Sequence, residues 1–267
     1  MSSGKLQGKT VVITGASAGI GRHMVRECAK QGASTLIIIA RSEDKLERLK
    51  AEVLMQYDDI QVDIFSLDMG DIAALQETFE KIKWNYSTVD VLINNAGFGV
   101  FALFEEANFE DMKKMFDVNV LGMMAATRML LPKMRQQGHG HIINVASIAG
   151  KLATPKSSVY SASKAAVLGF TNGLRMEVAP HGIRVTAVNP GPIKTNFFKT
   201  ADPEGNYVKN VARWMLTPED VAAKVVAAIG KRKREINLPF VMSAGAKLYQ
   251  LFPRTVDKIA GRLINKK

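Results

Sequence analysis

Short aliphatic segments alternate with amphipathic segments along most of this chain. The aliphatic segments predict buried strands at residues 9–14, 35–41, 60–67, 89–93, 141–146 and 183–188. The segments between them predict helices at residues 20–31, 43–56, 71–83, 109–135 and 159–178. Crossovers of that length make the strands parallel and place the helices on the faces of the sheet. The pattern therefore predicts an α/β fold, a doubly wound parallel sheet of about seven strands with helices on both faces.

The length of 267 residues suits one large domain better than two. We divide the chain into a flexible N-terminus at 1–8, a Rossmann-type domain at 9–240 and a C-terminal basic helical tail at 241–267. The opening residues lack an apolar signal region, and the longest aliphatic stretch, 36–40, is too short to cross a bilayer. We therefore expect a cytoplasmic protein.

Basic residues are concentrated near the C-terminus. Of the formal net charge of +11, the segment from Lys231 onward carries +8, from ten basic and two acidic residues. The last part of this segment has apolar residues at helical spacing, namely Val256, Ile259, Ala260, Leu263 and Ile264. Such a basic amphipathic helix suits packing on its own domain or on a partner subunit, and alternatively suits peripheral contact with an anionic membrane. No aromatic stacking platform accompanies the charge, so we do not expect nucleic-acid binding.

Cysteine and histidine give no sign of a metal site. The single cysteine, Cys28, excludes an intramolecular disulfide and falls within a predicted helix as a small, at least half-buried residue. The four histidines have no cysteine or carboxylate partners at ligand spacing. We therefore expect no metal.

A glycine-rich turn, TGASAGIG at 14–21, lies between the first predicted strand and the first predicted helix. Backbone N–H groups and the helix dipole at such a place are able to receive a pyrophosphate. The spacing is G-x-x-x-G-x-G, which differs from the commoner G-x-G-x-x-G fingerprint, and a glycine-rich turn by itself is sometimes only a turn. Its position between strand and helix favours a dinucleotide site.

The end of the second predicted strand indicates which dinucleotide is bound. An acidic residue normally stands there when the ribose carries no 2′-phosphate, but this chain has Ala40 followed by Arg41. A guanidinium favours a phosphate, so we predict NADP(H), unless Arg41 merely pairs with Glu43 or Asp44. Asp68, which closes the third strand, is a candidate partner for the adenine amino group or, alternatively, a cap for the next helix.

Ser147, Tyr160 and Lys164 form the candidate catalytic group. Tyr160 and Lys164 are four residues apart and share one face of a predicted helix, so the ammonium is able to lower the pKa of the phenol. Ser147 closes the preceding strand and is placed to hold a substrate oxygen. The alternative is an ordinary helix with one tyrosine and one solvated lysine.

Six motifs together resemble those of the short-chain dehydrogenase/reductase family over roughly residues 8 to 240. They are the TGASAGIG turn, NNAG at 94–97, Asn119 in a long helix, Ser147, the Tyr160–Lys164 pair, and NPGPIKT at 189–195. The resemblance implies that Tyr160 protonates a carbonyl oxygen, that Ser147 polarises it, and that Lys164 assists Tyr160 and binds the nicotinamide ribose. It also implies that Asn119 holds a water connecting Lys164 to solvent.

The same resemblance completes the predicted NADP(H) site, in which 190–195 covers the nicotinamide. Its predicted residues are Gly15, Ser17, Gly19, Ile20, Gly21, Arg41, Asp68, Met69, Asn95, Ala96, Gly97, Tyr160, Lys164, Pro190, Gly191, Ile193 and Thr195.

The loops that follow the catalytic strands are rich in apolar side chains. Our candidate substrate contacts among them are Phe98, Phe101, Phe197, Phe198 and Trp214. Their composition favours an apolar ketone or aldehyde, and segment 196–216, with its Gly and Pro, is predicted to be a mobile lid over the substrate.

We accordingly predict an NADPH-dependent reductase of apolar carbonyl compounds, reversible as an alcohol dehydrogenase. A homodimer or homotetramer formed through the two long helices is expected. The alternative enzyme is a 3-oxoacyl-acyl carrier protein reductase, although the chain lacks the Gly-Gly-containing final strand that is typical of those enzymes. The alternative without catalysis is an NADPH-binding regulator or a membrane-associated scaffold.

Overall fold

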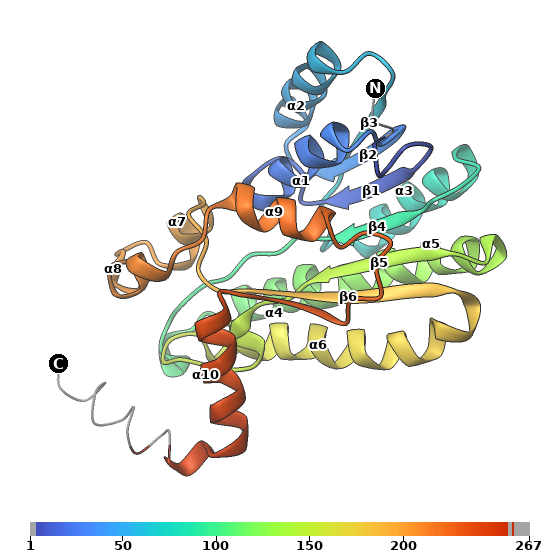
Figure 1. Cartoon of the computed structure of the whole chain (residues 1–267). Coiled ribbons are helices and arrows are strands. Elements are labelled where there is room, and N and C mark those ends of the chain that lie inside the picture. The colour runs from blue at the N-terminus through green and yellow to red at the C-terminus, as the bar shows by residue number, and fades with distance from the viewer. Residues whose placement is uncertain (1–3, 256–257, 259–267) are drawn as a thin grey trace.

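The computed structural model describes residues 4–255 and 258, and these form a seven-stranded sheet in which every neighbouring pair is parallel (Figure 1). The strand order is β3-β2-β1-β4-β5-β6-β7. The strands are β1 (Thr10–Thr14), β2 (Thr35–Ala40), β3 (Gln61–Ser66), β4 (Val91–Asn94), β5 (Gly140–Val145), β6 (Ile183–Pro190) and β7 (Glu235–Leu238). The predicted doubly wound sheet is confirmed.

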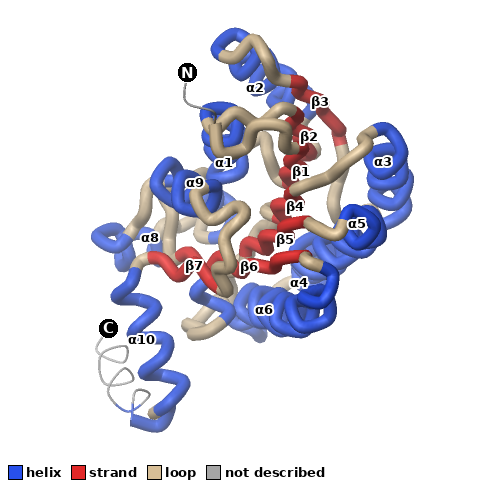
Figure 2. Tube along the Cα trace, turned by 45° about the vertical axis from the view of Figure 1, so that its right-hand side comes forward, coloured by secondary structure: helices blue, strands red, loops and turns tan. Residues whose placement is uncertain are grey.

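Helices cover both faces of this sheet (Figure 2). The helices are α1 (Gly19–Lys30), α2 (Glu43–Gln56), α3 (Ile72–Asn85), α4 (Phe109–Phe116), α5 (Met123–Gln137), α6 (Ser158–Val178), α7 (Phe197–Ala201), α8 (Asn206–Val211), α9 (Pro218–Val226) and α10 (Phe240–Leu251). One face packs against α1, α2 and α9, and the other packs against α3, α5 and α6.

The alternation of side chains along each strand divides the core into two layers. In β2, Leu36 and Ile38 join the cluster with α1, α2 and α9, whereas Ile37 and Ile39 join the cluster with α3, α5 and α6. All four side chains are fully buried. Because both faces of the strand are covered, every position from Leu36 to Ala40 is apolar, which explains the continuous aliphatic runs in the sequence. Burying each such side chain contributes about 1.5–3 kcal/mol to stability.

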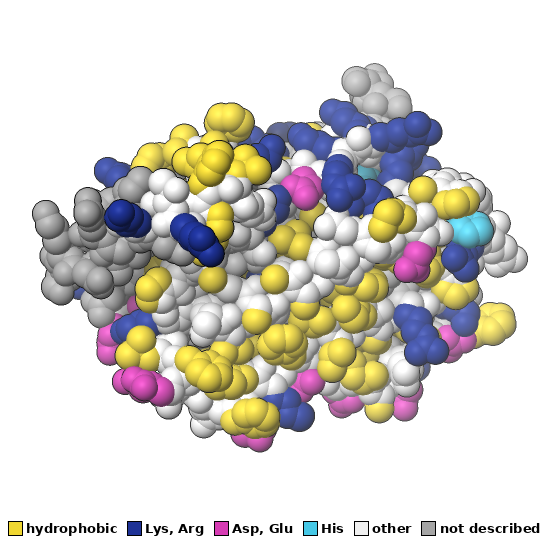
Figure 3. Space-filling model, turned by 90° about the horizontal axis from the view of Figure 1, so that it is seen from below, with side chains coloured by type: hydrophobic (Ala, Val, Ile, Leu, Met, Phe, Trp, Pro, Cys, Tyr) yellow, Lys and Arg dark blue, Asp and Glu magenta, His cyan; other side chains and the backbone are white. Residues whose placement is uncertain are grey.

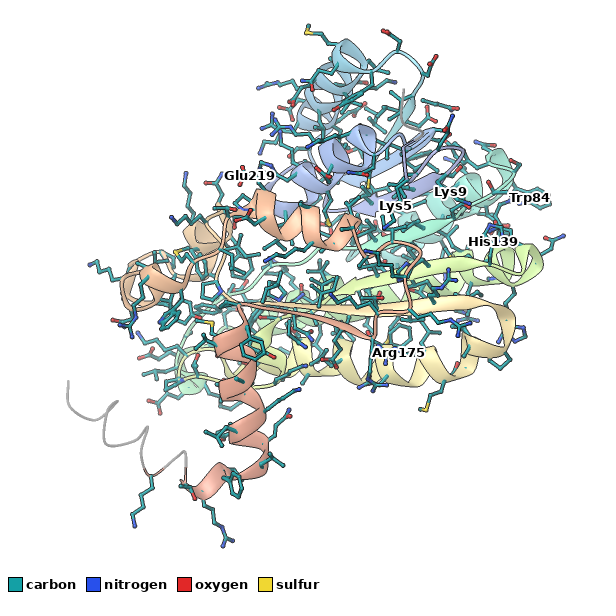
Figure 4. The ribbon with its side chains drawn as sticks, in the orientation of Figure 1. Lys5, Lys9, Trp84, His139, Arg175 and Glu219 are labelled. Carbon is teal, nitrogen blue, oxygen red and sulfur yellow. The ribbon has the colours of Figure 1, made fainter. Side chains whose placement is uncertain are left out.

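The amino-terminal ends of the central strands are joined through Asp90. Its carboxylate accepts hydrogen bonds from Thr10 N (3.0 Å) and Lys9 Nζ (2.8 Å), and it lies 3.1 Å from His139 Nε2. Figure 4 shows Lys9 and His139 at the same end of the sheet, away from α7 and α8. The carboxyl-terminal ends of the strands point the other way and are free to form a ligand site.

The long helix predicted at 109–135 is present as a continuous helical stretch, but its winding changes in the middle. Residues Asp117–Gly122 form a π-helical turn between α4 and α5. A Cβ on Gly122 would lie only 2.1 Å from the Met69 carbonyl oxygen, so the backbone here packs closely against the segment that follows β3. Hydrophobic periodicity does not reveal the altered winding of such a turn, which is frequent at functional sites.

The two ends of the chain differ from the expected boundaries. Within residues 4–8, which were assigned to a flexible N-terminus, Leu6 is buried and its N–H donates to the Gln31 carbonyl at 2.9 Å. The expected tail begins with a helix, α10, while the apolar pattern of 256–264 falls outside the described residues. No helix among the described residues is long and apolar enough to span a bilayer.

Candidate active site

A cleft of about 740 Å³ opens at the carboxyl-terminal ends of the strands. The turns after β1, β2, β4, β5 and β6 contribute to its walls, and so do α6, α7, α8 and α10. It lies where the strand order reverses between β1 and β4, which is the usual position of a ligand in an open α/β sheet.

The glycine turn after β1 has the conformation that a phosphate-binding turn needs. Gly15 has a φ of +66°, and a Cβ there would lie 2.8 Å from the Ala96 Cα. Ala18, the residue just before α1, provides no side-chain cap for the helix. The first turn of α1 carries no acidic residue. The first N–H groups of the helix and its dipole therefore face the cleft without an internal anion, and they fit a pyrophosphate.

Side-chain hydrogen bonds hold this turn against the end of β4. Thr14 Oγ1 accepts from Asn95 N (3.0 Å) and Ala96 N (3.1 Å), while Asn95 Nδ2 donates to the carbonyls of Thr14 (2.9 Å) and Gly15 (3.1 Å). Gly21 does not line the cleft. Its lack of a side chain instead allows α1 to approach the turn, because a Cβ would lie 2.1 Å from the Gly15 carbonyl oxygen.

The end of β2 places two cations on the cleft wall, Arg41 and Lys45. Arg41 Nη1 is 3.8 Å from Asp68 Oδ2, and both side chains are exposed, so this is a weak pair. Asp44 pairs with Arg48 (3.4 Å), so the suggested Arg41–Asp44 pair does not form.

Asp68 and Met69 both line the cleft beside these cations. Asp68 Oδ1 accepts from Gly70 N (2.9 Å), while Asp71 caps α3 by accepting from Ala74 N (3.0 Å). The suggested role of Asp68 as the helix cap is therefore filled by Asp71.

Ser147, Tyr160 and Lys164 converge on the middle of the cleft. Ser147 follows β5, its Oγ accepts from Ala149 N (3.1 Å), and it donates to the Pro190 carbonyl (3.4 Å). Both Tyr160 and Lys164 are buried on α6. Lys164 Nζ donates to the Val145 carbonyl (2.9 Å) and lies 5.9 Å from the centre of the Tyr160 ring.

The electrostatics of this pair differ from the expectation that the ammonium lowers the phenol pKa. Burial raises the pKa of Tyr160 to about 12, the Ser147 hydroxyl opposes this, and Tyr207 adds to it. Burial also lowers the pKa of Lys164 to about 8. Burial of the phenol is the largest of these effects, and a phenol with a raised pKa is protonated at neutral pH.

Asn119 does not line the cleft but lies directly behind it, in the π-helical turn. Its Oδ1 accepts from Phe98 N (3.0 Å), and its Nδ2 donates to the Phe98 carbonyl (2.9 Å) and to Ser163 Oγ (3.1 Å). Gly97 separates it from the lysine, since a Cβ there would lie 2.9 Å from Asn119 Oδ1 and 3.3 Å from Lys164 Nζ. Asn119 therefore fixes the loop after β4 beside Lys164.

Aromatic rings enclose Tyr160 on the side of the cleft that is nearest to segment 196–216, which we call the lid side. The centre of the Phe101 ring lies 5.8 Å from Tyr160 and 5.3 Å from Tyr207, and Phe197 lies 5.7 Å from Tyr160. Phe198 and Phe98 also line the cleft. Trp214 does not: its ring lies 4.9 Å from the Arg213 guanidinium instead. Residues 196–216, predicted as a lid, form α7, α8 and a 3₁₀ turn (Ala212–Trp214).

Several cleft residues were missed by the sequence analysis. The main ones are Lys45, Leu152, Thr154, Met242 and Gly245. Lys45 follows Arg41 by four residues, a spacing that could have indicated a second cation. Met242 and Gly245 belong to α10, and the helical pattern of that segment contains no sign that it returns to the cleft.

The remaining predicted residues occupy the cleft as expected from their motifs. They are Ser17, Gly19, Ile20, Gly191, Ile193 and Thr195.

Comparison with known proteins places this architecture in one family. The family model described as short chain dehydrogenase matches residues 9–205. The NADP-dependent 3-hydroxy acid dehydrogenase of Schizosaccharomyces pombe is 36% identical over 238 residues, which cover 87% of this chain and 91% of that protein.

Solved structures agree with this placement. A short-chain dehydrogenase from Sphingobium yanoikuyae in complex with NADPH has a TM-score of 0.80 and 25% identity, covering 97% of this chain and 96% of that one. A short chain dehydrogenase/reductase from Burkholderia phymatum in complex with NAD has a TM-score of 0.85 and 25% identity, covering 94% and 96%. The chain therefore belongs to the short-chain dehydrogenase/reductase family and is an oxidoreductase that acts on CH–OH groups.

Proposed function

We propose that this protein uses NADPH to reduce an apolar ketone or aldehyde to the alcohol, and that the reaction is reversible. The observation that carries this proposal is the aromatic enclosure of Tyr160. The charged side chains that line the cleft, among the described residues, are Arg41, Lys45, Asp68 and Lys164. The first three follow β2 and β3 at the dinucleotide end, and the fourth lies beside Tyr160, which leaves an uncharged, apolar lid side for the substrate.

The preference for NADP(H) rests on Arg41 and Lys45. Both cations line the cleft after β2, where a cofactor without a 2′-phosphate would meet an acidic residue. The similar structures hold NADPH in one case and NAD in another, so the choice of cofactor has to be argued from the side chains of this chain. The name of the fission-yeast relative, which is NADP-dependent, supports the same choice.

In this mechanism Tyr160 is the acid. When bound, the nicotinamide supplies a hydride to the carbonyl carbon. Ser147 Oγ holds the carbonyl oxygen, and Tyr160 donates its O–H proton to that oxygen, so the alcohol forms without a free alkoxide. The ammonium of Lys164 lies beside the phenol, where it stabilises the phenolate and returns a proton to it.

The same charges argue against a free 3-oxo acid as the preferred substrate. A carboxylate on the lid side would need a cation, and the cations that line the cleft in the described part are at the dinucleotide end or in the catalytic group. The 3-hydroxy acid dehydrogenase activity that names the fission-yeast relative is therefore less favoured here than reduction of an apolar ketone or aldehyde. A 3-oxoacyl thioester, which has no carboxylate, is the remaining competitor within this reaction class.

A panel of carbonyl compounds, followed by the loss of NADPH absorbance, tests the proposal. We expect higher kcat/KM for lipophilic ketones and aldehydes than for 3-oxo acids or acetoacetyl thioesters. The Tyr160→Phe variant should lose turnover while still binding NADPH. Absence of wild-type turnover across the panel would favour a binding role, and preference for the thioesters would favour an acyl carrier protein reductase.

We further propose that the protein forms a homodimer or homotetramer through the helices on the α4–α6 side. Phe109, Phe116 and Leu121 are exposed there. Light scattering at several protein concentrations tests this, because a stable monomer would exclude it.

A further inference from the structure

Helix α10 presents its apolar side chains to solvent. Ser243 and Ala246 are buried against the body, and Met242 packs on Gly191, where a Cβ would lie 2.8 Å from the Met242 sulfur. On the opposite side of the helix and just past its end, five large apolar side chains are between 54% and 82% exposed: Phe240, Val241, Leu248, Leu251 and Phe252. At about 100° per residue these five positions fall within one sector of about 120° around the helix axis.

We call these five residues the outer stripe. Their arrangement is the reverse of that on an ordinary surface helix. Such helices place apolar residues inward and charges outward, and exposed apolar side chains on a monomer are normally scattered singly. The helix also projects from the body in both views (Figures 1 and 2). A contiguous apolar stripe on a projecting helix marks a contact surface.

The charges beside the outer stripe indicate what it contacts. Between Ile236 and Val256 the sequence contains no Asp or Glu. Lys247 is exposed on α10, and Arg254 and Lys258 follow the helix, with Asp257 between them in the sequence. Figure 3 shows hydrophobic side chains gathered at this end of the molecule, with Lys and Arg side chains close by.

We propose that the outer stripe docks on an anionic lipid surface, with its apolar side chains among the acyl chains and Lys247, Arg254 and Lys258 at the phosphates. A helix with apolar and basic side chains lies in the interface plane in this way. A second copy of the chain fits less well. A symmetric contact between two stripes would bring Lys247 and Arg254 of both copies together, with no acidic residue between Ile236 and Val256 to pair with them.

The docking surface borders the cleft. Met242 and Gly245 of α10 line the cleft, while Val241 and Leu248 on the same helix belong to the outer stripe. A bilayer in contact with the stripe would thus lie next to the apolar lid side. This second step, delivery of an apolar carbonyl compound from the bilayer, rests on the proposed function; the docking does not.

Co-sedimentation of the full chain with vesicles tests the docking. We expect binding to phosphatidylcholine vesicles that contain phosphatidylserine, weaker binding to phosphatidylcholine alone, and loss of binding to the former at high salt. Replacing three stripe residues together, Leu248→Ser, Leu251→Ser and Phe252→Ser, should weaken binding at least about tenfold. None of the three lines the cleft, so NADPH-dependent turnover of a water-soluble carbonyl compound should not change.

A matched control removes three apolar side chains elsewhere that are at least as exposed. Met55→Ser, Trp84→Ser and Met176→Ser alter residues that are 73–86% exposed on α2, α3 and α6, and Figure 4 shows Trp84 far from α10. This variant should bind vesicles as the wild type does.

Arg254→Gln combined with Lys258→Gln tests the electrostatic part. This variant should lose affinity for phosphatidylserine-containing vesicles and show a weaker dependence on salt.

Three results would overturn the proposal. They are a wild type that fails to bind anionic vesicles, an equal loss of binding in the control variant, and a stripe variant that changes only the oligomeric state seen by sedimentation velocity, since the last would make the stripe a contact between copies. Failure of the proposed reductase function is distinguishable from failure of the docking, because it would leave vesicle binding intact while no carbonyl compound is reduced.

Discussion

Lys151 forms an ion pair with Glu235 that joins the catalytic serine loop to the edge strand of the sheet. Lys151 directly follows the 3₁₀ turn Ile148–Gly150, which begins next to Ser147, and Glu235 starts β7. Lys151 Nζ also donates to Asn237 Oδ1 (3.1 Å). Burial alone would raise the pKa of Glu235, but hydrogen bonds from Lys151 and Asn237 hold it below its ordinary value. The pair therefore connects the position of Ser147 with β7.

Breaking this pair should lower turnover more than cofactor affinity. We expect Lys151→Met and Glu235→Gln each to reduce kcat severalfold and to reduce the free energy of unfolding by about 1–2 kcal/mol. The two changes together should have little more effect than either alone, because each removes the same interaction. Steady-state kinetics, NADPH titration and urea unfolding measure these quantities.

Lys9→Met is the control for that experiment. Lys9 forms a 2.8 Å ion pair with Asp90 at the amino-terminal ends of the strands, away from the cleft. Its loss should reduce stability without changing kcat. A similar drop in kcat for Lys9→Met would mean that turnover merely follows stability, and that the Lys151–Glu235 pair has no particular influence on Ser147.

The pH dependence of reduction should follow Lys164. Burial lowers the pKa of its ammonium to about 8, whereas burial raises the pKa of Tyr160 to about 12. Lys164 is therefore charged below about pH 8 and loses its charge above it, while Tyr160 remains protonated throughout. We expect kcat/KM for reduction to be highest at or below neutral pH and to fall above pH 8. A rate that rises through this range would contradict the assignment.

The spacing of residues within each motif was enough to predict most of the residues that line the cleft. Tyr160 and Lys164 lie four residues apart on one helix, and Gly15 to Ile20 lie in one turn, so the distances within each motif are fixed by secondary structure. The strand pattern then fixed which ends of the motifs meet, since parallel strands bring their carboxyl ends to one edge.

What could not be predicted depends on packing between distant segments. The π-helical turn at Asn119 changes the winding of a helix without altering its apolar pattern. Met242 reaches the cleft only because α10 folds back over Gly191, which lies about fifty residues earlier in the chain. The raised pKa of Tyr160 reflects the side chains packed around the phenol, and these come from loops that no periodicity describes.

Arg41 and Lys45 should determine the choice between NADPH and NADH. Arg41→Ala combined with Lys45→Ala removes both cations that line the cleft after β2, and we expect kcat/KM with NADPH to fall about 10- to 100-fold. The value with NADH should hardly change, because NADH has no phosphate at this position. Parallel kinetics with the two cofactors measure the ratio. Arg48→Ala is the control, since Arg48 lies on α2 together with Lys45 but pairs with Asp44. Equal losses with both cofactors would contradict this assignment.

His141 should make the fold sensitive to mild acid. Its Nδ1 accepts from Gly230 N (3.1 Å) and its Nε2 lies 2.9 Å from Thr186 Oγ1, so the buried ring is neutral and holds the loop before β7 against the sheet. Burial lowers the pKa of His141 to about 4, with Arg184 and Lys5 adding to the effect. The unfolded chain therefore binds the proton more readily than the folded protein does.

The contribution of His141 is complete above the unfolded pKa of about 6.5 and is lost as the pH falls toward 4, by an amount on the order of 3 kcal/mol. Urea unfolding of the wild type should show this decrease, and a His141→Gln variant should be less stable at pH 7 but should lose less on acidification. His181→Gln, at an exposed histidine, should behave as the wild type does. An unchanged pH profile in the His141→Gln variant would show that other groups cause the acid sensitivity.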